Sequence, residues 1–109
     1  MGKLSPRLVE CLESVDRVTP IEVVVELQPV DVTALPAGSR HERVAALQAA
    51  FQRELAPVAQ RIEAAGGTVL ETAWLNQTVR SRLPAGALRS VAEEVAVHSI
   101  DLPHPIYPA

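Results

Sequence analysis

Side chains that could carry out chemistry are few in this chain of 109 residues, and they are spread along its length. Nucleophilic catalysis would require the single thiol, Cys11, to pair with a histidine as base. The sequence offers His41, His98 and His104. Cys11 falls on the apolar side of a short predicted helix, which favours a buried structural thiol. His98 falls within a predicted strand, and His104 lies between two prolines with no partner to fix its tautomer.

The other common catalytic and metal-binding patterns are also missing from the sequence. Aspartate and glutamate residues are scattered, without a paired general acid and base. The metal-ligand spacings C-x-x-C, H-x-x-x-H and H-E-x-x-H do not occur. Gly66-Gly67 is not a phosphate-binding loop, because it closes a predicted helix instead of opening one. The sequence therefore predicts a protein that is not an enzyme and that binds neither a metal ion nor a cofactor.

Composition narrows the class of protein further. A net charge of -3 argues against a nucleic-acid partner, since neutralising phosphates requires a basic surface. No apolar run approaches the roughly 20 residues of a membrane span, and the start lacks the apolar stretch of a secretory signal. A lone cysteine fits a reducing compartment. We expect a cytoplasmic protein, unless an upstream segment has been removed, that binds neither nucleic acid nor membranes.

The first third of the chain predicts a helix and then a strand. Residues 5–15 form a short amphipathic pattern, with Ser5 suited to the N-cap and Pro6 to the first helical position. Residues 21–27 alternate strictly, with Ile21 and the apolar residues at every second position on one face. This period of two, in β-branched residues, predicts a strand with one buried face.

A long helix is predicted over residues 39–65, after a loop from Pro29 to Gly38. Ser39 and Glu42 form a capping-box pattern. Apolar residues then recur at three- and four-residue steps: Val44, Leu47, Phe51, Leu55, Val58 and Ile62. Their phase continues across Pro57, which favours one bent helix over two. Gly66-Gly67 should end it by supplying a positive φ.

The remaining residues complete a mixed pattern. Strands are predicted over 68–74 and 77–83, with Leu75-Asn76 near the turn. A second helix opens at Pro84-Ala85-Gly86, and its apolar stripe is Leu88, Val91, Ala92 and Val95. A fourth strand follows over 96–102. The final residues, 103–109, contain three prolines and should be extended, because proline cannot donate to a sheet.

This order, β-α-β-β-α-β after the first helix, predicts an α+β fold. The right-handed crossover rule gives a ferredoxin-like, four-stranded antiparallel sheet with both helices on one face. We divide the chain into an N-terminal helical extension (1–19), one domain (20–102) and an extended C-terminal tail (103–109). The open face of the sheet should carry six residues: Glu22, Val24, Glu26, Thr78, Arg80 and Arg82. By composition alone it is a solvated face with cross-strand Glu–Arg pairs.

The second half of the chain resembles a known family. Its landmarks are Gly66-Gly67 followed by Thr68-Val69, then Ala87-Leu88-Arg89 and Val97 to Asp101. In these residues, and without a gap to Ala109, the chain is similar to subtilisin propeptides and the free-standing inhibitors of the same proteinase-inhibitor family. The match to the opening strand is less specific, so the resemblance covers about residues 20–109. Residues 1–19 lie outside it, and the 39–65 helix is longer than the family's.

The resemblance implies a serine protease inhibitor that binds a subtilisin-like protease in a 1:1 complex and could also assist its folding. In this family the last residues lie in the substrate cleft as a product would. Ala109 would then occupy the S1 pocket, Pro108 the S2 pocket, Tyr107 the S3 position and Ile106 the apolar S4 pocket. Without the resemblance, a proline-rich end would be an ordinary frayed terminus.

The resemblance also assigns the open sheet face to protease binding. The residues implied are Glu22, Glu26, Arg80, Arg82 and Asp101. Family members often carry an acidic cluster near the last strand, of which this chain retains only Asp101. The rival hypothesis is a ferredoxin-like protein-interaction or small-ligand-binding module with a disordered tail, which could form a homodimer through the open sheet face.

Overall fold

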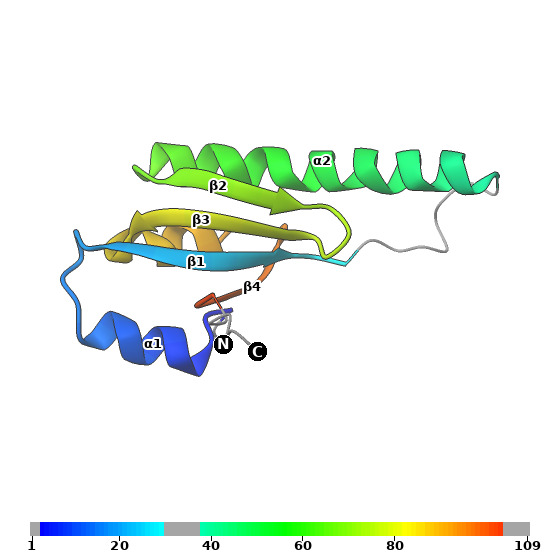
Figure 1. The fold of residues 1–109 in the computed structure, drawn as a ribbon. Coiled ribbons are helices and arrows are strands. Elements are labelled where there is room, and N and C mark those ends of the chain that lie inside the picture. The colour runs from blue at the N-terminus through cyan, green and yellow to red at the C-terminus, as the bar shows by residue number, and fades with distance from the viewer. Residues whose placement is uncertain (1–2, 30–37, 104–109) are drawn as a thin grey trace.

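The computed structural model describes residues 3–29 and 38–103, and the chain follows the predicted order of elements (Figure 1). The elements are α1 (Pro6–Glu13), β1 (Pro20–Leu27), α2 (Arg40–Ala64), β2 (Thr68–Ala73), β3 (Thr78–Pro84), the short 3-10 turn η2 (Ala85–Ala87), α3 (Leu88–Ala92) and β4 (Val97–Asp101). The strands form one sheet in the order β2-β3-β1-β4, and all three pairs are antiparallel. This is the predicted ferredoxin-like α+β topology, with an added N-terminal helix.

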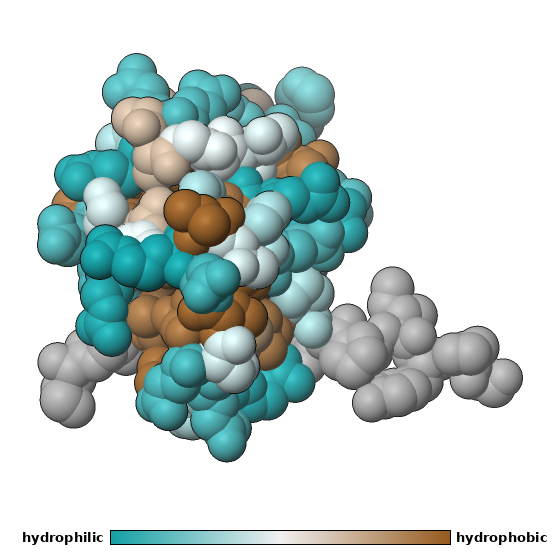
Figure 2. Space-filling view, turned by 90° about the vertical axis from the view of Figure 1, so that its left-hand side faces the viewer, coloured by the Kyte–Doolittle hydropathy of each residue, from teal (hydrophilic) through white to brown (hydrophobic). Residues whose placement is uncertain are grey.

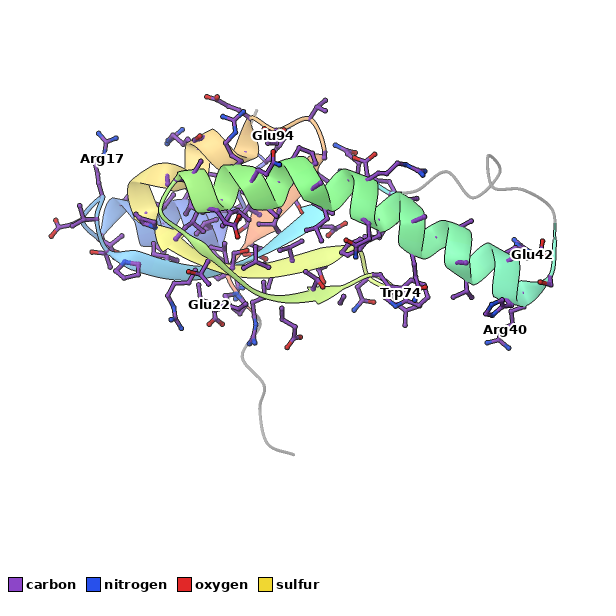
Figure 3. The ribbon with its side chains drawn as sticks, turned by 90° about the horizontal axis from the view of Figure 1, so that it is seen from above. Arg17, Glu22, Arg40, Glu42, Trp74 and Glu94 are labelled. Carbon is purple, nitrogen blue, oxygen red and sulfur yellow. The ribbon has the colours of Figure 1, made fainter. Side chains whose placement is uncertain are left out.

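One face of the sheet is buried under helices and the other is open. Seen from above, α2 and α3 lie on the same side of the sheet, whereas Glu22 points to the opposite side (Figure 3). The apolar residues of β1, from Ile21 to Leu27 at every second position, are at most 7% exposed, as the alternation predicts. The helices supply Phe51, Val58, Ile62, Leu88 and Val91 to the same core. A sheet with one covered face therefore follows from the period-two pattern.

Helix α2 is continuous through Pro57, so the prediction of one helix is confirmed. Ser39 caps it, because its Oγ accepts a hydrogen bond of 3.2 Å from the backbone N–H of Glu42. The start of α2 extends past the end of the strands (Figure 1). Its first apolar positions, Val44 and Leu47, are accordingly only half-buried, whereas Phe51, Val58 and Ile62 further along the stripe are buried. Most of the predicted loop before α2, residues 30–37, lies outside the described residues.

The two glycines that follow α2, Gly66 and Gly67, are needed for different reasons. Gly66 has a φ of 90°, a conformation that other residues rarely adopt, as predicted for a helix end. At Gly67 the reason is space, because a Cβ atom would lie 2.7 Å from Leu83 Cβ and 2.9 Å from the carbonyl oxygen of Arg82. The pair lets the chain turn tightly from α2 into β2.

The predicted apolar stripe of the second helix is wrong at its last position. Helix α3 ends at Ala92, and Val95 is 84% exposed instead of lying on the core face. The chain turns after Ala92, and Arg61 of α2 holds this turn by an ion pair of 2.8 Å with Glu94. Helical spacing continues in the sequence beyond the point at which the turn into β4 ends the helix.

Ser81 is the one polar residue among the buried side chains of the described residues. It lies in β3 between Val23 of β1 and Val69 of β2 and is fully buried. Its Oγ has no hydrogen-bond partner within residues 3–29 and 38–103. A buried hydroxyl without a partner destabilises a fold, because it loses its bonds to water.

We therefore expect Ser81→Ala to raise the free energy of unfolding by about 1 kcal/mol. Urea unfolding of both proteins would measure the difference. Ser99→Ala, at a half-buried position on β4, is the matched control and should change stability by less than about 0.5 kcal/mol. A loss of stability in Ser81→Ala would show that the hydroxyl makes a bond that stabilises the core.

Candidate functional site

The open face of the sheet, here called the outer face, collects the residues that the sequence predicted for it. In the β1–β3 ladder Glu22 lies opposite Arg82, Val24 opposite Arg80, and Glu26 opposite Thr78. Because opposite residues of an antiparallel pair share a face, these six side chains lie together. Glu22 and Val24 are half-buried, whereas Glu26, Arg80 and Arg82 are exposed.

Three ion pairs connect the charged side chains of the outer face. Arg80 lies between two carboxylates, with Nη1 3.8 Å from Glu22 Oε2 and Nη2 3.4 Å from Glu71 Oε2. Arg82 Nη2 lies 3.9 Å from Glu22 Oε1. The paired side chains are between 35% and 67% exposed, so each pair contributes about 0–1 kcal/mol to stability. These ion pairs therefore contribute little to the stability of the fold.

Glu71 also belongs to the outer face, a position that the sequence did not indicate. Counted by alternation from Thr68, which lies opposite Arg82, position 71 would point to the helix-covered face. A register shift between Val69 and Glu71 instead places Glu71 opposite Arg80. A bulge of this kind adds one residue to one strand and reverses the alternation beyond it. No feature of β2 alone would reveal the bulge, because it is defined by the pairing with β3.

Asp101, the last residue of β4, lies beside the outer face but is bound within the chain. It is opposite Val24 of the central strand β1. Its Oδ1 accepts hydrogen bonds from the hydroxyl of Ser5 and, at 2.7 Å, from the backbone N–H of Leu102. Arg7 Nη2 lies 3.5 Å from the same oxygen. The predicted protease-contacting carboxylate is thus engaged by the N-terminal extension, which the sequence did not anticipate.

The residues before α1 add a short pairing to the outer edge of β4. Leu4 forms a parallel bridge with Ile100. The N–H of Ser5 donates to the carbonyl of Ile100 at 2.9 Å, and the N–H of Ile100 donates to the carbonyl of Lys3 at 2.8 Å. Leu8 of α1 is fully buried and belongs to the main core. Residues 3–8 are therefore packed on the domain, and they cover part of an otherwise open strand edge.

The contacts of Asp101 lower the pKa of its carboxyl group. The hydrogen bond from Ser5 is the largest cause, and the Leu102 amide and the positive charge of Arg7 act in the same direction. Partial burial opposes them, because it disfavours the charged form. The charged carboxylate is the form that joins the extension to the end of β4.

The proposed cleft-binding residues Ile106, Tyr107, Pro108 and Ala109 lie outside the described residues. What the structure does describe is the point from which this segment starts. The chain leaves β4 at Asp101, next to the outer face, and continues through Leu102 and Pro103, which are half-buried. The start of the C-terminal segment and the outer face are therefore neighbours.

The candidate catalytic side chains do not come together where they are described. Cys11 is half-buried and packs against the core, and His41 and His98 are exposed. His104 lies outside the described residues. Over residues 3–29 and 38–103 no group of three His, Cys, Asp or Glu residues is placed to hold a metal ion. Within the same ranges no helix combines the length and the apolar character needed to cross a bilayer.

A pocket of about 380 Å³ lies where α1 and the residues after it meet the start of α3. Its lining includes Val9, Leu12, Glu13, Val15, Arg17, Ala85, Gly86 and Arg89. Figure 2 views one end of the molecule and shows apolar side chains gathered on it among polar ones. The pocket is separate from the outer face, and none of the predicted site residues lines it.

No family model matches the chain, and no curated protein matches it.

The lowered pKa of Asp101 gives a prediction for stability at acid pH. A carboxyl whose pKa is lower in the folded state stabilises the protein above its unfolded pKa, near 4, and loses this contribution as pH falls through the folded value. Because the group is 35% exposed, we expect a contribution of about 1 kcal/mol or less. Wild type should therefore exceed Asp101→Asn in stability by a constant amount between about pH 6 and 8.

Below about pH 4 the two proteins should converge. Urea unfolding at a series of pH values measures this difference directly. Glu26→Gln, which removes an exposed carboxylate of the outer face, is the control for the loss of one negative charge. A difference between wild type and Asp101→Asn that persists unchanged to about pH 2 would contradict the role of the carboxylate.

Proposed function

We propose that this protein inhibits a subtilisin-like serine protease, with residues 106–109 in the substrate cleft and the outer face on the protease surface. The observation that supports this best is the proximity of the two elements. The chain leaves β4 at Asp101 and continues into the C-terminal segment (residues 103–109) directly beside a sheet face on which no helix lies within residues 3–29 and 38–103. A single partner surface could therefore contact both, in a 1:1 complex.

The chemistry of the segment suits binding in a cleft. An extended peptide pairs through its main chain with the edge of a cleft, and alternate side chains enter pockets. Prolines at 103, 105 and 108 restrict the free segment, so less conformational entropy is lost when it binds. By the family resemblance, Ala109 would occupy the S1 pocket and Ile106 the apolar S4 pocket. The protein would supply no catalytic group of its own.

The outer face suits a polar contact with the protease surface. Glu22, Arg80 and Arg82 are held by ion pairs longer than 3.3 Å and remain partly exposed, so a partner can replace them at small cost. Charges of this kind act mainly on the association rate and on its salt dependence. In this proposal the outer face steers and orients the complex, and the C-terminal segment blocks the cleft.

We expect removal of residues 106–109 to weaken inhibition by at least about a hundredfold, or roughly 3 kcal/mol of binding free energy. The melting temperature should change little, because the deleted residues follow β4 and the sheet lies before them. The inhibition constants of the intact and truncated proteins can be measured from the steady-state hydrolysis of a peptide by several subtilisin-like proteases. The intact protein should inhibit competitively with the peptide substrate. A variant with residues 106–109 replaced by Gly-Ser-Gly-Ser keeps the length and should inhibit as poorly as the truncation.

Within the segment, Ile106→Asp should weaken inhibition more than Tyr107→Ala. A carboxylate in the apolar S4 pocket loses both solvation and packing, on the order of 2–4 kcal/mol, whereas a side chain at S3 is expected to point to solvent.

Equal inhibition by the intact and truncated proteins would overturn the cleft-binding proposal. The interaction-module hypothesis would then be preferred, and sedimentation of the free protein would test its homodimer.

Reversal of two outer-face charges, Arg80→Glu with Arg82→Glu, should slow association with the protease about tenfold at low salt, and the effect should shrink in high salt. The control is Arg43→Glu with Arg53→Glu, the same charge change at two exposed positions of α2, on the covered side of the sheet. The association rate constants of both double variants can be measured by stopped-flow or surface-based binding. If both double variants slow association equally, net charge is responsible and the outer face is ordinary solvent surface.

A further inference from the structure

The first residue after β4 has both of its backbone groups bound. The N–H of Leu102 donates to Asp101 Oδ1 at 2.7 Å, and its carbonyl accepts from Arg7 Nη2 at 3.2 Å. The second bond joins positions that are 95 residues apart in the sequence. Leu102 is thus held from the side by a residue of the N-terminal extension at the point where the C-terminal segment begins.

The groups that hold Leu102 are themselves anchored. Ser5 donates its hydroxyl to Asp101, and the same Oγ accepts the N–H of Leu8 at 3.2 Å as the N-cap of α1. The backbone N–H of Ser5 bonds to Ile100 of β4 at 2.9 Å. Because Leu8 is fully buried, α1 is fixed to the core, and Arg7 precedes Leu8 directly. These contacts therefore connect the start of α1, the end of β4 and Leu102 to one another.

Only three residues, Pro103, His104 and Pro105, separate Leu102 from Ile106. Two of them are prolines, whose rings restrict φ. A direction fixed at Leu102 would therefore have only these three residues between it and Ile106. Fixing that direction before binding reduces the conformational entropy that is lost when an extended segment enters a cleft.

We propose that residues 3–7 act as a positioning clamp, in which Ser5 and Arg7 fix the direction of the C-terminal segment as it leaves β4 and thereby strengthen inhibition. This inference rests on the proposed function and extends it to residues outside the family resemblance. Arg7 is a positioning residue that acts through Leu102 and Asp101. The clamp accounts for the contacts of Asp101, whose carboxylate lies beside the outer face but is bound by Ser5 and Arg7 of the N-terminal extension.

The test compares Arg7→Ala in the intact protein and in the protein that lacks residues 106–109. If Arg7 acts through the segment, Arg7→Ala should weaken binding to the protease about two- to fivefold in the intact protein, as expected for one partly exposed charged contact, and leave the truncated protein's binding unchanged. Arg7→Lys keeps the charge near Asp101 and should recover part of the loss. Arg53→Ala, at an exposed position of α2, is the control for charge and should have no effect.

A measurement without protease keeps the two proposals separate. The ¹⁵N relaxation of the Leu102 amide should report increased motion in Arg7→Ala, while the amides of Val23 and Val25 in β1 stay as rigid as in wild type. An equal loss of binding in intact and truncated proteins would mean that Arg7 is only structural and would overturn the clamp, as would unchanged relaxation at Leu102. If wild type inhibits no subtilisin-like protease, the proposed function is overturned, and the relaxation of Leu102 alone decides whether the clamp exists.

Discussion

Burial of a single face of the sheet is the constraint on which the rest of this structure depends. The chain has few aromatic residues, so its core is assembled from branched aliphatic side chains that alternate along β1 and β3 under α2 and α3. The same alternation forces Glu22, Arg80 and Arg82 to the opposite side. The outer face is therefore polar and open as a consequence of how the core is made. Its ion pairs are too exposed to hold the fold, which leaves them available for recognition.

Local patterns in the sequence were sufficient to predict the fold. β1, the cap at Ser39 and the glycine pair after α2 each follow from residues that are near one another in the chain. What could not be predicted depends on distant partners. The end of α3 before Val95 depends on how the chain enters β4, and the exposure of Glu71 on the outer face depends on a bulge in the β2–β3 pairing. In both cases the periodic pattern of the sequence extends past the point at which the structure departs from it.

The most consequential of these unpredicted features is the junction at Asp101. Ser5 and Asp101 are 96 residues apart, and neither has a sequence pattern that would connect them. The structure joins them through a hydroxyl that caps α1 and binds the end of β4 at the same time. Residues 3–8, which the sequence suggested were an appendage, are therefore bonded to the strand from which the C-terminal segment departs. A carboxylate that resemblance assigned to a protease surface has a defined partner within its own chain.

In the function proposed for this protein, the C-terminal segment covers the catalytic cleft of a subtilisin-like protease. The most direct measurement is the rate at which a sulfonyl fluoride reacts with the catalytic serine of such a protease, followed by mass spectrometry, in the presence of saturating inhibitor. If the cleft is occluded, the intact protein should slow sulfonylation in proportion to the fraction of protease bound, and the protein lacking residues 106–109 should leave it unprotected. Sulfonylation of a fully bound protease at the rate of the free enzyme would contradict the account, because the cleft would then be open.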